Sequence, residues 1–162
     1  MLPIMALGGR VVIMPKADLT EFLRLIAQRR VTHTFLPPTL IYMLLEHPKL
    51  AETDRSSLQC FWYGAAPISA TRLEEAIGKI GPVMAQLFGQ TEAPMMISTM
   101  APKDHFRPDG AIARERLASA GRPSPLLQVG VMDEDGRLLP TGRARRNCSA
   151  RIARHARLLQ EL

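Results

Sequence analysis

Residues 86–94 read QLFGQTEAP and hold the side chains best suited to chemistry in this chain. Phe88 offers an aromatic face on which a nucleobase can stack, and Thr91 offers a hydroxyl group to a phosphate. Glu92 supplies carboxylate oxygens of the kind that Mg²⁺ binds. Each role has an ordinary structural alternative, because an aromatic residue at a strand end commonly packs in the core and a Thr-Glu pair commonly caps a helix. Their occurrence together predicts part of a nucleotide site.

A second stretch, GAAPIS at residues 64–69, is made mostly of small side chains. Gly64, Ala65 and Ala66 leave the backbone open, so that a flat ligand can lie directly against it. For this stretch alone we give equal weight to the alternative of a tight turn between a strand and a helix. Its combination with residues 86–94 favours a ligand-binding role.

Residues 64–69 and residues 89–94, the later part of the first stretch, stand at the ends of predicted strands of one sheet. Short β-rich runs alternate with amphipathic helical runs, and such strands pair through crossover connections. We therefore expect an α/β fold, with a mostly parallel sheet and helices on both of its faces. Ligands bind such sheets at the carboxyl ends of the strands, which is where both stretches fall. The predicted strands are 10–15, 31–37, 58–64 and 83–89, and the predicted helices are 18–30, 38–47 and 69–81, with Asp18 and Ser69 as amino-terminal caps.

The pattern changes beyond residue 100. Residues 100–125 are rich in proline, glycine and charge, which is typical of a surface connection. Residues 126–142 predict a β-hairpin that turns at Asp135 and Gly136. The chain thus divides into a body of residues 1–142 and a tail of residues 143–162.

The formal net charge of +6 is concentrated in the tail, where six arginines stand against Glu161. Because residues 1–142 are nearly neutral, we do not expect the body to bind nucleic acid. An alternative is a basic amphipathic helix with Ile152, Leu158, Leu159 and Leu162 on one side, which would bind an anionic membrane or nucleic acid. Their spacing is too sparse and uneven for us to favour this alternative.

Cysteine usage and the amino-terminal sequence indicate a cytoplasmic protein. Cys60 and Cys148 stand far apart, with no CxxC pair and no histidine at metal-ligand spacing, so neither a zinc site nor a disulfide framework is expected. The apolar opening, residues 1–15, is broken by Gly8 and Arg10 well short of the roughly 20 residues that a membrane-spanning helix needs. We therefore predict no transmembrane segment.

Three consecutive stretches carry a resemblance to a known family. FWYGAAPIS, QLFGQTEAPM and SAGRPSPLLQVGVMDEDGRLLPTG are similar to successive signatures of the adenylate-forming superfamily, the AMP-dependent synthetases and acyl-CoA ligases. THTFLPPTLIYMLLEHP resembles the segment that precedes them in that family. The resemblance extends over residues 1 to about 142, which would make the body a partial AMP-binding domain.

The resemblance implies a two-step reaction with ATP, Mg²⁺ and coenzyme A. A carboxylate attacks the α-phosphate of ATP to give an acyl-adenylate and pyrophosphate, and a thiol then takes the acyl group. By this resemblance Thr91 and Glu92 are the catalytic residues: Thr91 binds the α-phosphate, and Glu92 holds the Mg²⁺. Phe88 stands where the family usually has a tyrosine that stacks on the adenine. The implied nucleotide-binding set is Gly64, Ala65, Ala66, Pro67, Phe88, Gly89, Gln90 and Thr91.

The substrate class follows from the resemblance and from apolar character. His33, Phe35, Met95 and Met96 are expected to flank the acyl channel, which fits a fatty or aryl carboxylate better than a polar amino acid. For His33 alone we favour the simpler interpretation of a packed strand residue.

Further parts that the resemblance implies are not found in the sequence: the Gly/Ser/Thr-rich phosphate loop ending in lysine, the ribose-binding aspartate and the catalytic lysine. We therefore expect a fragment of an ATP-dependent acyl-CoA synthetase that does not adenylate by itself. The alternatives are a non-catalytic remnant, a pseudo-subunit that associates with a full-length ligase, and a polyanion-binding protein that uses its basic tail.

The tail is expected to be frameshifted sequence or to be disordered. Arg143 to Cys148 can be encoded by codons that, moved on by one nucleotide, give Glu-Arg-Gly-Glu-Ile-Val. That pattern is similar to the family's continuation after LPTG, so the nucleotide sequence of the gene tests this hypothesis.

Overall fold

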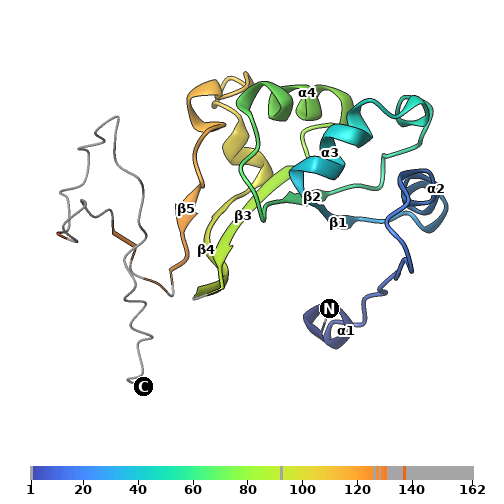
Figure 1. Cartoon of the computed structure of the whole chain (residues 1–162), viewed down its shortest axis with the longest axis horizontal. Coiled ribbons are helices and arrows are strands. Elements are labelled where there is room, and N and C mark those ends of the chain that lie inside the picture. Colours follow the sequence, from blue (N-terminus) through green and yellow to red (C-terminus); the bar gives the residue numbers. More distant parts are fainter. Residues whose placement is uncertain (1, 92, 126, 128, 131–136, 138–162) are drawn as a thin grey trace.

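The computed structural model describes residues 2–91, 93–125, 127, 129, 130 and 137 (Figure 1). A five-stranded sheet, accompanied by helices, forms the body of the described chain. The helices are α1 (Leu2–Ala6), α2 (Leu19–Arg29), α3 (Pro38–Leu45), α4 (Ala70–Ile80) and the 3-10 turns η1 (Pro48–Leu50), η2 (Pro102–His105) and η3 (Arg114–Arg116). The strands are β1 (His33–Leu36), β2 (Cys60–Tyr63), β3 (Met84–Gln90), β4 (Ala93–Met100) and β5 (Arg122–Pro123).

The strands lie in the order β1-β2-β3-β4-β5. β1 pairs parallel to β2, and β2 pairs parallel to β3, as the crossover connections predict. β4 and β5 are antiparallel additions. Only Thr91 and Glu92 separate β3 from β4 in the sequence, and so short a connection allows antiparallel pairing alone. The predicted α/β class is confirmed, with a parallel part that carries both loops of interest.

The helices form where the sequence places caps and apolar stripes. Ser69 caps α4 by accepting a hydrogen bond from the backbone N–H of Arg72, and Asp18 caps α2 by accepting one from Glu21. The buried residues of α4 are spaced so that they fall on one helical face. They are Leu73, Ala76, Ile77 and Ile80. Figure 1 shows α3 and α4 on the same side of the sheet, and this side holds the core.

The two faces of the parallel strands differ in burial. Phe61 and Tyr63 of β2 are fully buried in the core cluster. On the opposite face, Phe35 lies in register with Trp62, and its side chain remains 44% exposed. Residues in register on neighbouring strands share one face of a sheet, so this second face is the more open one within the described chain.

One predicted strand is wrong. Residues 10–15 form no strand in the structure, and Ile13 is 77% exposed. A β-rich run becomes a strand when a neighbour pairs with it, and none of the described strands pairs with this segment. β1 consequently forms one edge of the sheet.

The region after β4 packs more closely than a surface connection would. His105, Ala113 and Leu117 of this region are buried, and Arg114 of η3 forms an ion pair with Glu74 of α4 at 2.5 Å. The hairpin predicted at Asp135 and Gly136, and the whole tail of residues 143–162, lie outside the described residues. No helix in the described part of the chain is both long and apolar enough to cross a membrane.

Candidate functional site

The first predicted loop, residues 64–69, connects β2 to α4, so the structural alternative of a strand-to-helix turn is confirmed. Gly64 at its start is buried against β3. A Cβ atom on Gly64 would overlap the carbonyl oxygen of Leu87 and lie 3.1 Å from Leu87 Cδ1. The absence of a side chain is therefore what lets the loop reach β3 so closely.

The middle of this loop is open to solvent. Ala65, Ala66 and Pro67 are all exposed, and Ala65 adopts a left-handed backbone conformation with φ of 65°. A left-handed conformation is unfavourable for a residue that has a Cβ atom, and such outliers concentrate at functional loops. These small side chains leave the backbone of the loop accessible to solvent.

A hydrogen bond joins the carboxyl end of the 64–69 loop to α3. The backbone N–H of Ser69 donates a hydrogen bond to the hydroxyl oxygen of Tyr42 over 3.0 Å. The Arg72 guanidinium group lies 5.7 Å from the centre of the Tyr42 ring, and it also pairs with Glu46 at 2.8 Å. Sequence reasoning missed Tyr42, because an aromatic residue within a predicted helix gives no sign of a loop contact.

The amino end of the loop begins at a buried polar pair that the sequence also did not predict. The Tyr63 hydroxyl group lies 3.0 Å from His105 Nε2 and 3.4 Å from Gln86 Oε1. Burial raises the pKa of the Tyr63 hydroxyl. Burial likewise lowers the pKa of His105, against smaller opposing effects from the Ala101 and Pro102 backbone and from Asp104. Both groups are therefore held neutral at pH 7.

The second loop lies beside the first at the same edge of the sheet. Tyr63 is in register with Gln86, and Gly64 continues alongside Leu87, the residue that precedes Phe88. The expected meeting of the two stretches is thus confirmed. We refer to residues 64–69 together with residues 88–92 as the rim.

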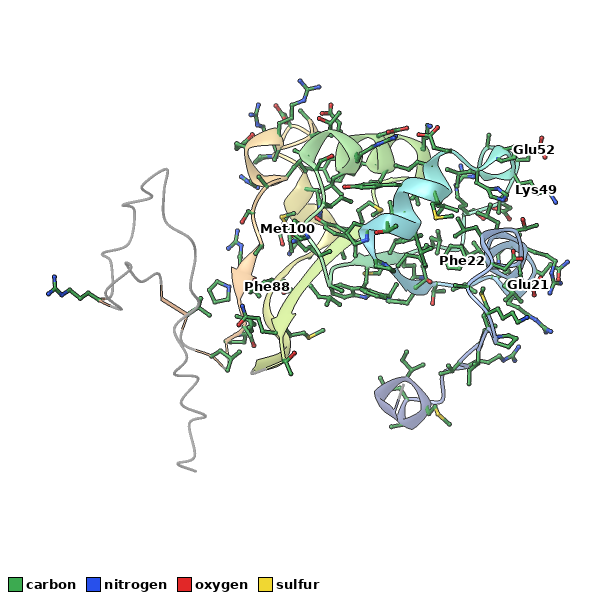
Figure 2. All side chains as sticks on the ribbon, viewed as in Figure 1. Glu21, Phe22, Lys49, Glu52, Phe88 and Met100 are labelled. Carbon is green, nitrogen blue, oxygen red and sulfur yellow. The ribbon has the colours of Figure 1, made fainter. Side chains whose placement is uncertain are left out.

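Exposure increases along β3, from its buried amino end to its exposed carboxyl end at the rim. Phe88 is half-buried, Gly89 is partly buried, and Gln90 and Thr91 are exposed. The pairing of β3 with β4 shifts register between Phe88 and Gln90, which places an irregularity at Gly89. Thr91 lies in the turn between two strands, so the alternative of a helix cap is wrong. Figure 2 shows Phe88 on the part of the β3–β4 hairpin that projects away from the helices.

The described side chains of the rim carry no ionisable group. They can stack on a ligand or form hydrogen bonds with it, but they cannot exchange protons with it. Glu92, the predicted Mg²⁺ ligand, lies outside the described residues. Among the residues that the structure does describe, no cluster of three or more His, Cys, Asp or Glu could hold a metal ion.

The predicted acyl-channel residues are only partly gathered at the rim. His33 is at the amino end of β1, the end opposite the rim, and its side chain is exposed, so the expectation that it packs is wrong. Phe35 is near the carboxyl end of the strand on the open face of the sheet. Met96 is 43% exposed with φ of 57°. The side chain of Met95 lies outside the described part of the chain.

A separate hollow of about 230 Å³ lies beside β4 and β5. It is not at the rim, since its lining comes from the end of β4, from η2, and from the segment that runs from the end of η3 into β5. Its lining residues are Met100, Asp104, Arg116, Ser119, Gly121 and Arg122.

Comparison with known proteins identifies relatives of nearly the whole chain. A sequence profile of the AMP-binding enzymes matches residues 1–144. The medium/long-chain-fatty-acid–CoA ligase FadD8 of Mycobacterium tuberculosis is 40% identical over 146 residues, which are 90% of this chain and 24% of that protein. The fatty acid–[acyl-carrier-protein] ligase ScoC of Streptomyces coeruleorubidus is 31% identical over 91% of this chain and 27% of its own length.

Solved structures agree with the sequence relatives. The amide bond synthetase McbA of Marinactinospora thermotolerans is similar, with a TM-score of 0.77 and 38% identity over 86% of this chain and 27% of that one. ATP-bound MatB of Rhodopseudomonas palustris is similar, with a TM-score of 0.67 and 28% identity over 83% of this chain and 25% of that one. The chain thus spans about a quarter of the length of the proteins that it matches.

Proposed function

The chain belongs to the AMP-binding enzyme family, and from this premise we propose that its rim binds the adenylate part of ATP and of an acyl-AMP intermediate. The observation that carries this proposal is the close approach of Gly64 to Leu87, which sets two open loops side by side at the carboxyl ends of parallel strands. Ligands of α/β sheets bind at this edge.

The assigned roles follow the character of each rim residue. Phe88, half-buried and next to Leu87 in β3, provides a stacking surface for the adenine, while the exposed residues Ala65 and Ala66 border the base. Thr91 donates a hydrogen bond from its exposed hydroxyl group to the α-phosphate. The described side chains of the rim are uncharged, which suits the uncharged base, so that other groups have to offset the charge of the phosphates.

Glu92 would hold the Mg²⁺ ion in this assignment. The family chemistry needs a cation that offsets the negative charge of the phosphates during displacement, and a carboxylate next to Thr91 in the sequence is a suitable ligand. The chain's own contribution is then to orient the α-phosphate, through Thr91, toward an incoming carboxylate.

We assign the substrate to the fatty or aryl carboxylic acids and the acceptor to coenzyme A or a related thiol. Phe35 and Met96 are exposed apolar side chains on strands next to the rim, and they suit an apolar acyl group. The names of two relatives, a fatty-acid–CoA ligase and a fatty acid–[acyl-carrier-protein] ligase, point to the same class.

A second candidate is association with another synthetase chain. The edge of β1, which pairs with β2 alone among the described strands, and the open face that bears Phe35 favour it, because exposed strand edges and apolar faces seek partners. In this case the 162-residue chain contributes a nucleotide-binding rim to an assembly rather than a complete active centre.

Calorimetry of ATP binding with and without Mg²⁺, on the wild-type chain and on Glu92→Ala, tests the proposal. We expect the wild type to bind ATP more tightly with Mg²⁺ than without it, and Glu92→Ala to lose this difference. We also expect no pyrophosphate release from the 162-residue chain with ATP, Mg²⁺ and a fatty acid. An equal Mg²⁺ effect in both proteins would remove Glu92 from the assignment.

A further inference from the structure

The buried pair of Tyr63 and His105 lies directly next to the rim, yet neither residue belongs to it. Tyr63 is the last residue of β2, and Gly64 follows it as the first residue of the rim. Both side chains are fully buried, and their rings meet edge to face with centroids 5.9 Å apart. The pair therefore connects β2 to η2, 42 residues further along the chain.

The hydrogen-bond geometry fixes where the protons lie. His105 Nδ1 is 3.0 Å from the carbonyl oxygen of Ala101, which can only accept, so Nδ1 must carry a hydrogen. In the neutral ring Nε2 is then an acceptor, and the Tyr63 hydroxyl donates to it over 3.0 Å. The longer contact, at 3.4 Å to Gln86 Oε1, competes for the same proton.

Protonation of His105 would reverse this arrangement. Nε2–H would then donate to the Tyr63 oxygen, and the Tyr63 proton would have to turn to Gln86. Burial opposes this state and lowers the pKa of His105. Among the described groups, Asp104 is the one charged residue that acts on His105, and its carboxylate already accepts the Ala101 N–H at 3.1 Å.

The consequence for the rim follows from the position of Tyr63. Gln86 is its register partner on β3, so the hydroxyl group of Tyr63 ties the end of β2 to β3 as well as to η2. Gly64 has to approach the carbonyl oxygen of Leu87 closely, and a small shift at the end of β2 would break that approach.

We propose that neutral His105 is a positioning residue for the rim: through the hydroxyl group of Tyr63 it holds the end of β2, and thereby Gly64, Ala65 and Ala66, in the geometry that receives a nucleotide. The proposal rests on the proposed function for its ligand, but the order of the loop can be measured without any ligand. The side-chain hydrogen bonds and ring contact of His105 in the described part of the chain go to Tyr63 and Ala101 and not to the rim, so His105 acts through Tyr63.

Two matched variants separate positioning from general packing. In His105→Gln the side-chain amide can reach the position of Nε2, so that the Tyr63 hydroxyl group keeps a hydrogen-bond partner. In His105→Asn the shorter amide can reach only the position of Nδ1. The carbonyl oxygen of Ala101 then keeps its hydrogen bond, while the Tyr63 hydroxyl group loses the one to residue 105. Both variants are uncharged, and neither can respond to protonation.

The first readout is the backbone order of Gly64, Ala65 and Ala66 from nitrogen-15 relaxation, with Ala76 in α4 as the internal control. We expect order parameters of about 0.85 in the wild type and in His105→Gln, and below about 0.6 at the three loop residues in His105→Asn. Acidification below the lowered pKa of His105 should loosen the loop in the wild type and not in His105→Gln. Equal order at the three loop residues in all three proteins would overturn the proposal.

The second readout is the affinity for AMP. We expect His105→Asn to lose about fivefold, the equivalent of one ordinary hydrogen bond, and His105→Gln to bind as the wild type does. If the wild type itself bound no AMP, the proposed function would fail while the relaxation result still decided the positioning role. Should His105→Asn fail to fold, Tyr63→Phe, which removes only the hydroxyl group, takes its place, and an ordered loop in that variant would contradict the proposal.

Discussion

Gly64 and Leu87 approach each other so closely that the carbonyl oxygen of Leu87 occupies the space which a Cβ atom on Gly64 would need. This contact joins the end of β2 to β3 and brings the two rim loops together. Any side chain at residue 64 would push the loop away from β3, so this position requires glycine.

Gly64→Ala should therefore destabilise the chain by about 1–3 kcal/mol, the usual cost of forcing a methyl group into occupied space. The matched control is Gly78→Ala in α4, where a Cβ atom meets nothing within 4 Å. Alanine favours helices over glycine, so the control should gain about 0.5–1 kcal/mol. Urea unfolding followed by fluorescence of Trp62, the single tryptophan, measures both changes. Equal stability of the two variants would contradict the close contact.

Ala65→Val should cost about 1–2 kcal/mol, because Ala65 has φ of 65° and a β-branched side chain is strongly disfavoured there. Ala66→Val provides the comparison, since Ala66 is also exposed but does not have a positive φ. The same unfolding measurement applies. A cost at residue 66 that matches the cost at residue 65 would show that the loop does not adopt this conformation.

Tyr42→Phe should destabilise the chain by about 1 kcal/mol, because it leaves the backbone N–H of Ser69 without its 3.0 Å partner while the ring stays in place next to Arg72. A double-mutant cycle with Arg72→Met distinguishes the hydroxyl contact from the ring contact, since the loss should be the same in both backgrounds. A loss that disappears when Arg72 is absent would assign the effect to the ring instead.

The stability of the chain should fall as the pH drops below about 6.5. The pKa of His105 is lower in the folded chain than in the unfolded chain because of burial, so the unfolded state binds the proton first. The contribution of neutral His105 to the free energy of unfolding is complete above the pKa of the unfolded state, and it is lost as the pH falls toward the pKa of the folded state. Unfolding curves from pH 7.5 to 5 should show this decline in the wild type and a flatter profile in His105→Gln.

A second acid transition should occur at lower pH and be independent of His105. Hydrogen bonds from Arg107 are the main cause that lowers the pKa of the Glu115 carboxyl group to about 2. Because this value lies far below the window of His105, Glu115→Gln should leave the decline between pH 7.5 and 5 unchanged. A shift of that decline in the variant would mean that the two titrations are coupled.

Local patterns predicted most of the parallel part of the sheet. The spacing of apolar residues and the caps at Asp18 and Ser69 were sufficient for α2 and α4, because these features act within one or two helical turns. The three parallel strands and the position of the rim at their carboxyl ends followed from the alternation of elements. These conclusions needed no knowledge of distant contacts.

Contacts between distant segments account for what the sequence did not predict. The run at residues 10–15 has the composition of a strand but pairs with none of the described strands, whereas β4 forms despite Pro94 because β3 offers it a partner. His105 stands in a stretch rich in proline, glycine and charge, yet it is fully buried against Tyr63. A composition typical of a surface loop cannot reveal such a pairing.

Titration of the chain with AMP by calorimetry tests the central claim most directly, in the wild type, in Phe88→Ala and in Met43→Ala. Met43 is an exposed apolar side chain on α3, 56% exposed, and serves as the control. We predict that the wild type and Met43→Ala bind AMP alike and that Phe88→Ala binds at least about fivefold more weakly, because stacking on an aromatic side chain contributes about 1–3 kcal/mol per base. AMP binding that Phe88→Ala leaves unchanged, or no binding to the wild type, would contradict the assignment of the rim as an adenylate site.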